Sequence, residues 1–101
     1  MKAHELKAFL ETHGYKQDQW GHYKKEITST RLADNTTQTV LHRYKMQKTS
    51  VRHEVQLGEG KNKFWHRRWS QYYCNIEIRD GKIKMTQKIT PADKIQEEGG
   101  N

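Results

Sequence analysis

The segment VLHRYKMQKTSVRHEVQL, residues 40–57, decides the fold, because apolar and polar side chains alternate along two runs that a short turn separates. One face of the first run carries Val40, His42, Tyr44 and Met46, and after the turn the parity changes to Val51, His53, Val55 and Leu57. A two-residue turn at residues 48–49 would bring both rows onto one face of a sheet, with Val40 opposite Leu57 at the far end. Arg43 would then lie opposite Glu54 on the other face. The segment therefore predicts an antiparallel hairpin with one apolar and one charged face.

A second hairpin is predicted around Asp80-Gly81, since a type I′ turn needs positive φ at both central residues. The register that this turn implies pairs Ile78 with Ile83, Ile76 with Met85, Tyr72 with Ile89 and Glu77 with Lys84. Cys74 falls in the apolar row of this hairpin, so we expect a buried, unreactive thiol.

The N-terminal segment is predicted to be a helix over residues 3–13. Its apolar residues follow the i, i+3, i+4, i+7 spacing of one helix face, and Gly14 occupies the position that a left-handed helix end requires. A strand follows from Trp20, which we expect to pack against the helix end. The turn-rich run LADNTTQ, residues 32–38, should interrupt the strands.

These elements predict an α+β fold: an N-terminal helix followed by a five- or six-stranded antiparallel meander sheet, or by a partly open barrel. Residues 1–90 would form a single domain and residues 91–101 a loosely ordered tail with a helix start at Thr90-Pro91. Only 16 of the 101 residues are Leu, Ile, Val or Phe, so the core must rely on aromatic side chains. A core this thin also suits a homodimer.

The composition favours an anionic partner. The net charge is +7 and the isoelectric point about 9.6, which attracts nucleic acid or an acidic protein. A single cysteine allows no internal disulfide, and no segment approaches the ~20 apolar residues that span a bilayer. We therefore expect a cytoplasmic protein with no membrane contact.

The stretch KNKFWHRRWSQYYC, residues 61–74, interleaves basic and aromatic side chains. As a strand over residues 64–69, with a bend or bulge near Ser70-Gln71, it would place Trp65, Arg67 and Trp69 on one face. Lys61, Lys63, Arg67 and Arg68 could then meet phosphates while Trp65 or Trp69 stacks on a base. In the alternative interpretation both tryptophans face the core and the arginines are solvated.

The charged face of the first hairpin carries Arg43, Lys45 and Arg52. The predicted register sets Lys45 directly opposite Arg52, where like charges repel unless an anion lies between them or both side chains splay into water.

Metal or catalytic chemistry has little support in the residue spacing. His42 and His53 share a face diagonally, but no Cys pair or carboxylate cluster accompanies them. A metal-independent ribonuclease could use His22, His42 or His66 with Arg67, although no spacing singles out a pair. We predict no cofactor, no metal and no catalytic residues.

The sequence thus predicts a small basic binding protein that contacts RNA or DNA through a positive sheet surface. The predicted nucleic-acid-binding residues are Arg43, Lys45, Arg52, Lys61, Lys63, Trp65, Arg67, Arg68 and Trp69. A non-enzymatic protein-interaction module or accessory subunit is the alternative, and a metal-independent ribonuclease the minor one.

Overall fold

The computed structural model describes residues 1–86 and contains one helix and two antiparallel sheets. A five-stranded sheet has the order β1-β2-β3-β4-β5, and a small sheet pairs β6 with β7. The elements are α1 (Ala3–Thr12), β1 (Lys16–Gln17), β2 (Tyr23–Arg31), β3 (Thr36–Met46), β4 (Ser50–Leu57), β5 (Phe64–Tyr72), β6 (Ile76–Arg79) and β7 (Lys82–Met85), with 3₁₀ turns at Gly60–Asn62 and Tyr73–Asn75. The predicted α+β class is confirmed, and the sheet is open rather than barrel-like. The predicted tail, the helix start at Thr90-Pro91 and the Tyr72–Ile89 pair lie at least partly outside the described residues.

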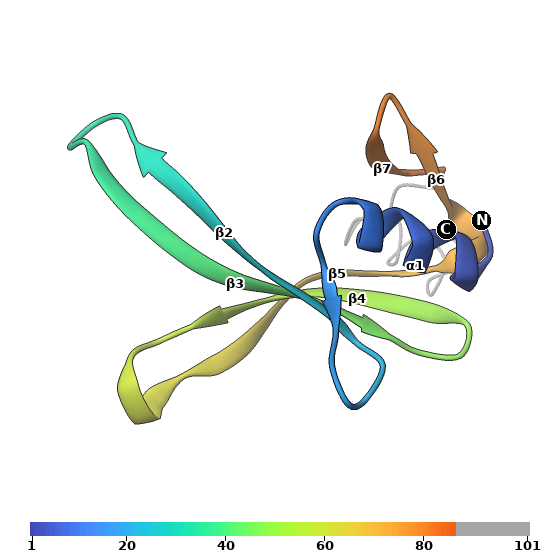
Figure 1. Ribbon diagram of the computed structural model, residues 1–101, viewed down its shortest axis with the longest axis horizontal. Helices are drawn as coiled ribbons and strands as arrows, with labels where there is room; N and C mark the ends of the chain where they lie inside the picture. The colour runs from blue at the N-terminus through green and yellow to red at the C-terminus, as the bar shows by residue number, and fades with distance from the viewer. Residues whose placement is uncertain (87–101) are drawn as a thin grey trace, which may run out of the picture.

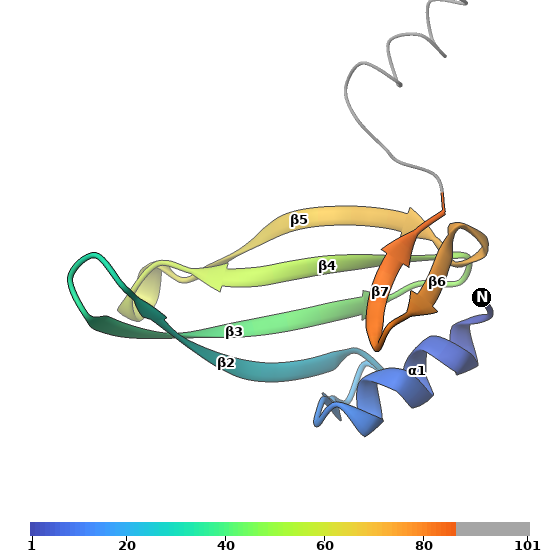
Figure 2. The same cartoon turned by 90° about the horizontal axis from the view of Figure 1, so that it is seen from above.

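The large sheet is strongly twisted, so the tips of its β2–β3 and β4–β5 hairpins diverge at one end of the molecule (Figure 1). The helix and the β6–β7 hairpin gather at the other end (Figure 2). Both pack against one face of the sheet, which we call the inner face; the opposite face is the outer face.

The core lies between α1, the inner face and β6. Leu6 and Leu10 of the helix are buried against Tyr23, Tyr44 and Val51 of the sheet, together with Tyr73 and Ile76. Aromatic rings therefore supply much of the buried surface, as the shortage of aliphatic residues predicts.

The end of α1 is fixed by the predicted glycine. Gly14 has φ +86°, its N–H donates to the Glu11 carbonyl, and the Tyr15 N–H donates to the Leu10 carbonyl at 3.0 Å. This pattern is a Schellman motif, which turns the chain back toward the sheet.

The β3–β4 hairpin has the predicted register from Met46–Val51 to His42–Val55, whereas Val40 and Leu57 are outside its paired positions. Neither residue of its turn has positive φ, so the turn is not of a primed type. Tyr73 holds this turn from outside: its N–H donates to the Thr49 carbonyl at 3.1 Å and its hydroxyl to the Gln47 carbonyl at 2.6 Å. Hydrogen bonds from a distant residue thus stabilise a turn whose own residues do not favour a primed type.

The β2–β3 connection is shorter than expected. Strand β3 already begins at Thr36, and the loop contains only residues 32–35, with Asn35 at φ 59°. Asp34 accepts hydrogen bonds from the N–H and hydroxyl of Thr36, which closes the loop early. The prediction that residues 36–38 interrupt the strands was wrong.

The chain between β5 and β6 also differs from prediction. The β6–β7 register and the Asp80-Gly81 turn, with φ of 55° and 70°, are confirmed. The 3₁₀ turn at Tyr73–Asn75, however, breaks the predicted alternation. As a result Tyr73 is buried while Tyr72 and Cys74 are exposed, so the expected buried thiol was wrong.

Candidate nucleic-acid interface

The outer face collects most of the basic side chains predicted to bind nucleic acid. The register pairs Lys24 with Arg43, Arg43 with Glu54, Lys45 with Arg52, Glu54 with Arg67 and Gln56 with Trp65. Side chains at paired positions share a face, so all of these lie opposite the helix. Within residues 1–86, no helix or second sheet covers this face. We call the set Lys24, Arg43, Lys45, Arg52, Trp65 and Arg67 the outer-face cluster.

An ion pair lies at the centre of this cluster. The Arg43 Nε donates to Glu54 Oε1 at 2.8 Å, and a second guanidinium nitrogen contacts the same oxygen. Both side chains are largely buried, with 15% and 8% of their surface exposed. The half-buried Trp65 lies over the guanidinium, its ring centroid 3.8 Å from the Arg43 Cζ. Arg43 is therefore a structural cation that supports Trp65 rather than a free phosphate ligand.

Lys24 extends the same cluster toward the sheet edge. Its Nζ lies 3.3 Å from Asp18 Oδ2, 5.9 Å from the Trp65 ring and 6.0 Å from the Trp20 ring. Trp20 is 68% exposed and does not pack against the helix, so that prediction was wrong. Two tryptophans thus flank one lysine on the outer face. Lys24 follows Tyr23 in β2 and so lies on the opposite face, where the pairing of β2 with β3 brings it beside Arg43.

Lys45 and Arg52 face each other across β3 and β4, as the sequence predicts. Among the described residues neither has an acidic side chain within ion-pair distance, and the same holds for Arg67. These three side chains are therefore the uncompensated cations of the cluster.

A β-bulge in β5 places Trp65 and Trp69 on opposite faces of the sheet. The register pairs Glu54 with Arg67 but His53 with Trp69, which leaves Arg68 as the extra residue. Trp65 and Arg67 therefore lie on the outer face, while Trp69 lies on the inner face against Tyr44 and His53. The prediction that Trp65, Arg67 and Trp69 share one face was wrong, because the bulge falls before Trp69 rather than near Ser70-Gln71.

The remaining predicted residues lie elsewhere. Lys61 and Lys63 are exposed in the loop at the tip of the β4–β5 hairpin. Arg68 is the unpaired residue of the bulge, and its charge helps to lower the pKa values of His42 and His53. The structure therefore brings together Arg43, Lys45, Arg52, Trp65 and Arg67, and separates them from Lys61, Lys63, Arg68 and Trp69.

The histidines considered for catalysis lie on both faces of the sheet: His42 and His66 both pair with Val55 on the inner face, two strands apart. His22 lies beside the outer-face cluster, where its Nδ1 accepts the Met46 N–H at 3.1 Å. Burial, opposed by Asp18 and assisted by Arg43 and Lys45, lowers the pKa of His22. His42 instead lies on the inner face, with its Nδ1 3.0 Å from the His53 Nε2. In the part of the chain that the structure describes, no three potential metal ligands cluster.

Comparisons with protein-family models, with curated proteins and with solved structures found no significant match for this chain. The helix found among residues 1–86 is too short and too polar to cross a membrane. The functional assignment therefore rests on the geometry of this molecule.

Proposed function

We propose that this protein binds single-stranded nucleic acid through the outer-face cluster and catalyses no reaction. Lys45, Arg52 and Arg67 contact phosphates, and Trp65 stacks on a base from the side that Arg43 does not occupy. The single observation that supports the proposal most is the pair Lys45–Arg52, two cations set opposite each other with no acidic partner among the described residues.

The charge balance of the face supports an anionic ligand. Glu54 is engaged by Arg43 and Asp18 by Lys24, so neither neutralises the three uncompensated cations. Glu26 is the remaining acid on the outer side of β2, and it is exposed. A phosphate between Lys45 and Arg52 would relieve their repulsion.

The aromatic part of the proposal rests on the support of Trp65. Its ring is held by a buried guanidinium on one side, which orients it without help from a ligand. A preoriented ring stacks on a base at low entropic cost, and such stacking contributes ~1–3 kcal/mol per base. Because stacking is tolerant of base identity, we expect little sequence preference.

The test is a fluorescence-anisotropy titration with labelled single-stranded RNA and DNA. Three phosphate contacts predict that affinity falls roughly 10- to 20-fold between 50 and 200 mM salt. Arg52→Ala should reduce the slope of log K against log salt by about 0.7, whereas Lys84→Ala, an equal charge change on β7, should leave it unchanged. Binding that ignores salt, or an equal effect of both variants, would contradict the proposal.

Trp65→Leu tests the stacking contact separately. It keeps an apolar cover over Arg43 but removes the π surface, so affinity should fall about fivefold or more while the salt slope stays the same. Trp20→Leu is the matched control on the same face.

A protein partner is the second candidate, and the exposed edge of the sheet favours it. Strand β5 is an edge strand of the large sheet in residues 1–86, and its ends expose Phe64 and Tyr72 by 55% and 58%. Edge strands with exposed aromatic residues are typical docking elements. Sizing chromatography with light scattering, together with a pull-down, would favour this candidate if a stoichiometric protein partner or a second copy of the chain appears without nucleic acid.

A further inference from the structure

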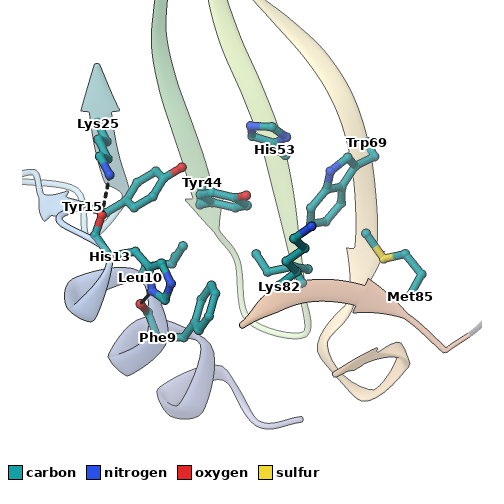
Figure 3. Close-up of a pocket in the computed structure, with 11 residues that line it drawn as sticks. Phe9, Leu10, His13, Tyr15, Lys25, Tyr44, His53, Trp69, Lys82 and Met85 are labelled. Carbon is teal, nitrogen blue, oxygen red and sulfur yellow. Dashed lines mark hydrogen bonds between the residues drawn. The ribbon is translucent and has the colours of Figure 1, made fainter. Parts of the chain in front are cut away.

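A pocket of ≈ 380 Å³ opens on the inner face, between α1 and the β6–β7 hairpin (Figure 3). Ligand pockets commonly measure ~300–1,000 Å³, so this one suits a small molecule. It lies on the side of the sheet opposite the outer-face cluster, and it shares no residue with that cluster.

Aromatic rings from successive strands form the floor of the pocket. The Tyr44 and His53 rings are stacked with centroids 4.7 Å apart and an interplanar angle of 10°. Trp69 lies at an angle to both, with centroids 5.7 Å from His53 and 6.0 Å from Tyr44. On the other side Tyr15 meets Tyr44 edge-on at 5.3 Å. The rings are held by β3, β4 and β5, so the floor is rigid and suited to a flat apolar ligand.

The walls come from two elements that the fold brings together. The helix supplies Phe9 and Leu10, and β7 supplies Ile83 and Met85 (Figure 3). Methionine adapts to the shape of a bound ring and makes favourable contacts with aromatic edges.

The charged groups that line the pocket are basic. The lining includes Lys25 and Lys82 and no Asp or Glu. The Lys25 Nζ already donates to the His13 carbonyl at 2.7 Å and lies 5.7 Å from the Tyr15 ring. Lys82 is exposed on β7, has no ion-pair partner among the described residues, and points toward the floor near Trp69 (Figure 3). Lys82 is thus the cation available to a ligand.

The histidine of the floor adds no counter-charge. Burial, together with His42 and Arg68, lowers the pKa of His53 to about 4, so its ring is neutral at neutral pH. The neutral imidazole is stacked between Tyr44 and His42, so it supports the Tyr44 ring and adds no charge to the floor.

We propose that this pocket binds a small planar aromatic anion, with its ring against Tyr44 and Trp69 and its anionic group on Lys82. The ligand class includes aromatic carboxylates and mononucleotides, which share a flat ring and a single anionic group. The pocket would therefore act independently of the outer-face cluster.

The test uses ¹⁵N-labelled full-length protein titrated with 2-naphthoate and followed by NMR. The indole N–H signal of Trp69 should shift, while those of Trp20 and Trp65 should not, because only Trp69 lines the pocket. The neutral analogue 2-naphthalenemethanol should bind about tenfold more weakly, because it lacks the charge-assisted hydrogen bond. Cyclohexanecarboxylate, an anion without a flat ring, should also bind more weakly.

Two variants on the same strand complete the test. Lys82→Ala should weaken 2-naphthoate binding about tenfold, whereas Lys84→Ala, also exposed on β7 but outside the pocket, should leave it unchanged. The proposal is overturned if all three indole signals shift together, if the neutral analogue binds as tightly, or if the two variants have equal effects. AMP and 2-naphthoate titrated in parallel distinguish the two sources of the ligand.

Discussion

The two faces of β3 and β4 bury different kinds of side chain: aromatic and aliphatic groups on the inner face, and an ion pair on the outer face. On the inner face Tyr44 is 8% exposed beneath the helix, whereas on the outer face Glu54 is 6% exposed although no helix lies above it. The inner face excludes water with a second layer of structure. On the outer face the Trp65 ring lies over the Arg43 guanidinium, which is paired with Glu54. A charged sheet face can therefore be ordered without a covering layer, provided that a large ring shields its central ion pair.

The inner face should carry the larger share of the stability. Leu6 is fully buried, so Leu6→Ala should lower the free energy of unfolding by ~2–5 kcal/mol through lost burial and the cavity left behind. Urea denaturation followed by circular dichroism measures this. Leu32→Ala is the control, because Leu32 is 92% exposed and its removal should change stability by less than ~0.5 kcal/mol. Similar losses for both variants would show that α1 does not pack as described.

The ion pair of the outer face should come next. Glu54→Gln leaves the largely buried Arg43 without its counter-charge, and we expect a loss of about 2–3 kcal/mol. A double-mutant cycle with Arg43→Met isolates the interaction, because removing both charges should cost less than the sum of the single changes. If the losses of Glu54→Gln and Arg43→Met simply add in the double variant, the interaction between the two charges does not stabilise the fold.

Sequence alone predicted the parts of this comparison that depend on local pattern. The alternation in residues 40–57 fixed both the register of β3 with β4 and the pairing of Arg43 with Glu54. The Asp80-Gly81 turn and the end of α1 followed in the same way from backbone preferences that single residues carry.

The missed parts depend on contacts between distant segments. Nothing local marks Arg68 as the bulge residue, yet that single insertion moves Trp69 to the inner face and divides the predicted site in two. The burial of Tyr73 likewise depends on its hydrogen bonds to the β3–β4 turn. One of these bonds joins Tyr73 to Gln47, which is 26 residues away in the sequence. The position of the bulge and the burial of Tyr73 depend on contacts between distant segments, which the alternation of apolar and polar residues does not predict.

The inner face should also respond to pH. The pKa of His53 is lowered to about 4 by burial, with His42 and Arg68 acting in the same direction and Glu54 opposing them. His53 binds a proton below about pH 6.5 in the unfolded chain but only below about pH 4 in the folded protein. The free energy of unfolding should therefore fall as the pH drops from 6.5 toward 4. Allowing for partial exposure of the ring, we expect a loss on the order of 1 kcal/mol by pH 5.

Thermal unfolding between pH 7 and 4.5 measures this loss, and an NMR titration of the His53 imidazole locates its pKa directly. His53→Phe keeps the stack on Tyr44 and should flatten the pH dependence. An unchanged slope in that variant would assign the effect to other groups.

The smallest expected effect, that of Lys45→Gln, tests whether the outer face contributes to stability or to ligand binding. Lys45 and Arg52 repel each other across the strands, so Lys45→Gln should raise stability by about 0.3 kcal/mol at low salt and by nothing near 1 M salt, where the screening length is about 3 Å. Lys84→Gln is the matched control with the opposite sign, because Lys84 faces Glu77 across β6 and β7. If Lys45→Gln stabilises the free protein but weakens oligonucleotide binding, the repulsion is maintained for the ligand. If it destabilises the protein instead, Lys45 serves the fold, and the main support for an anionic ligand on the outer face is lost.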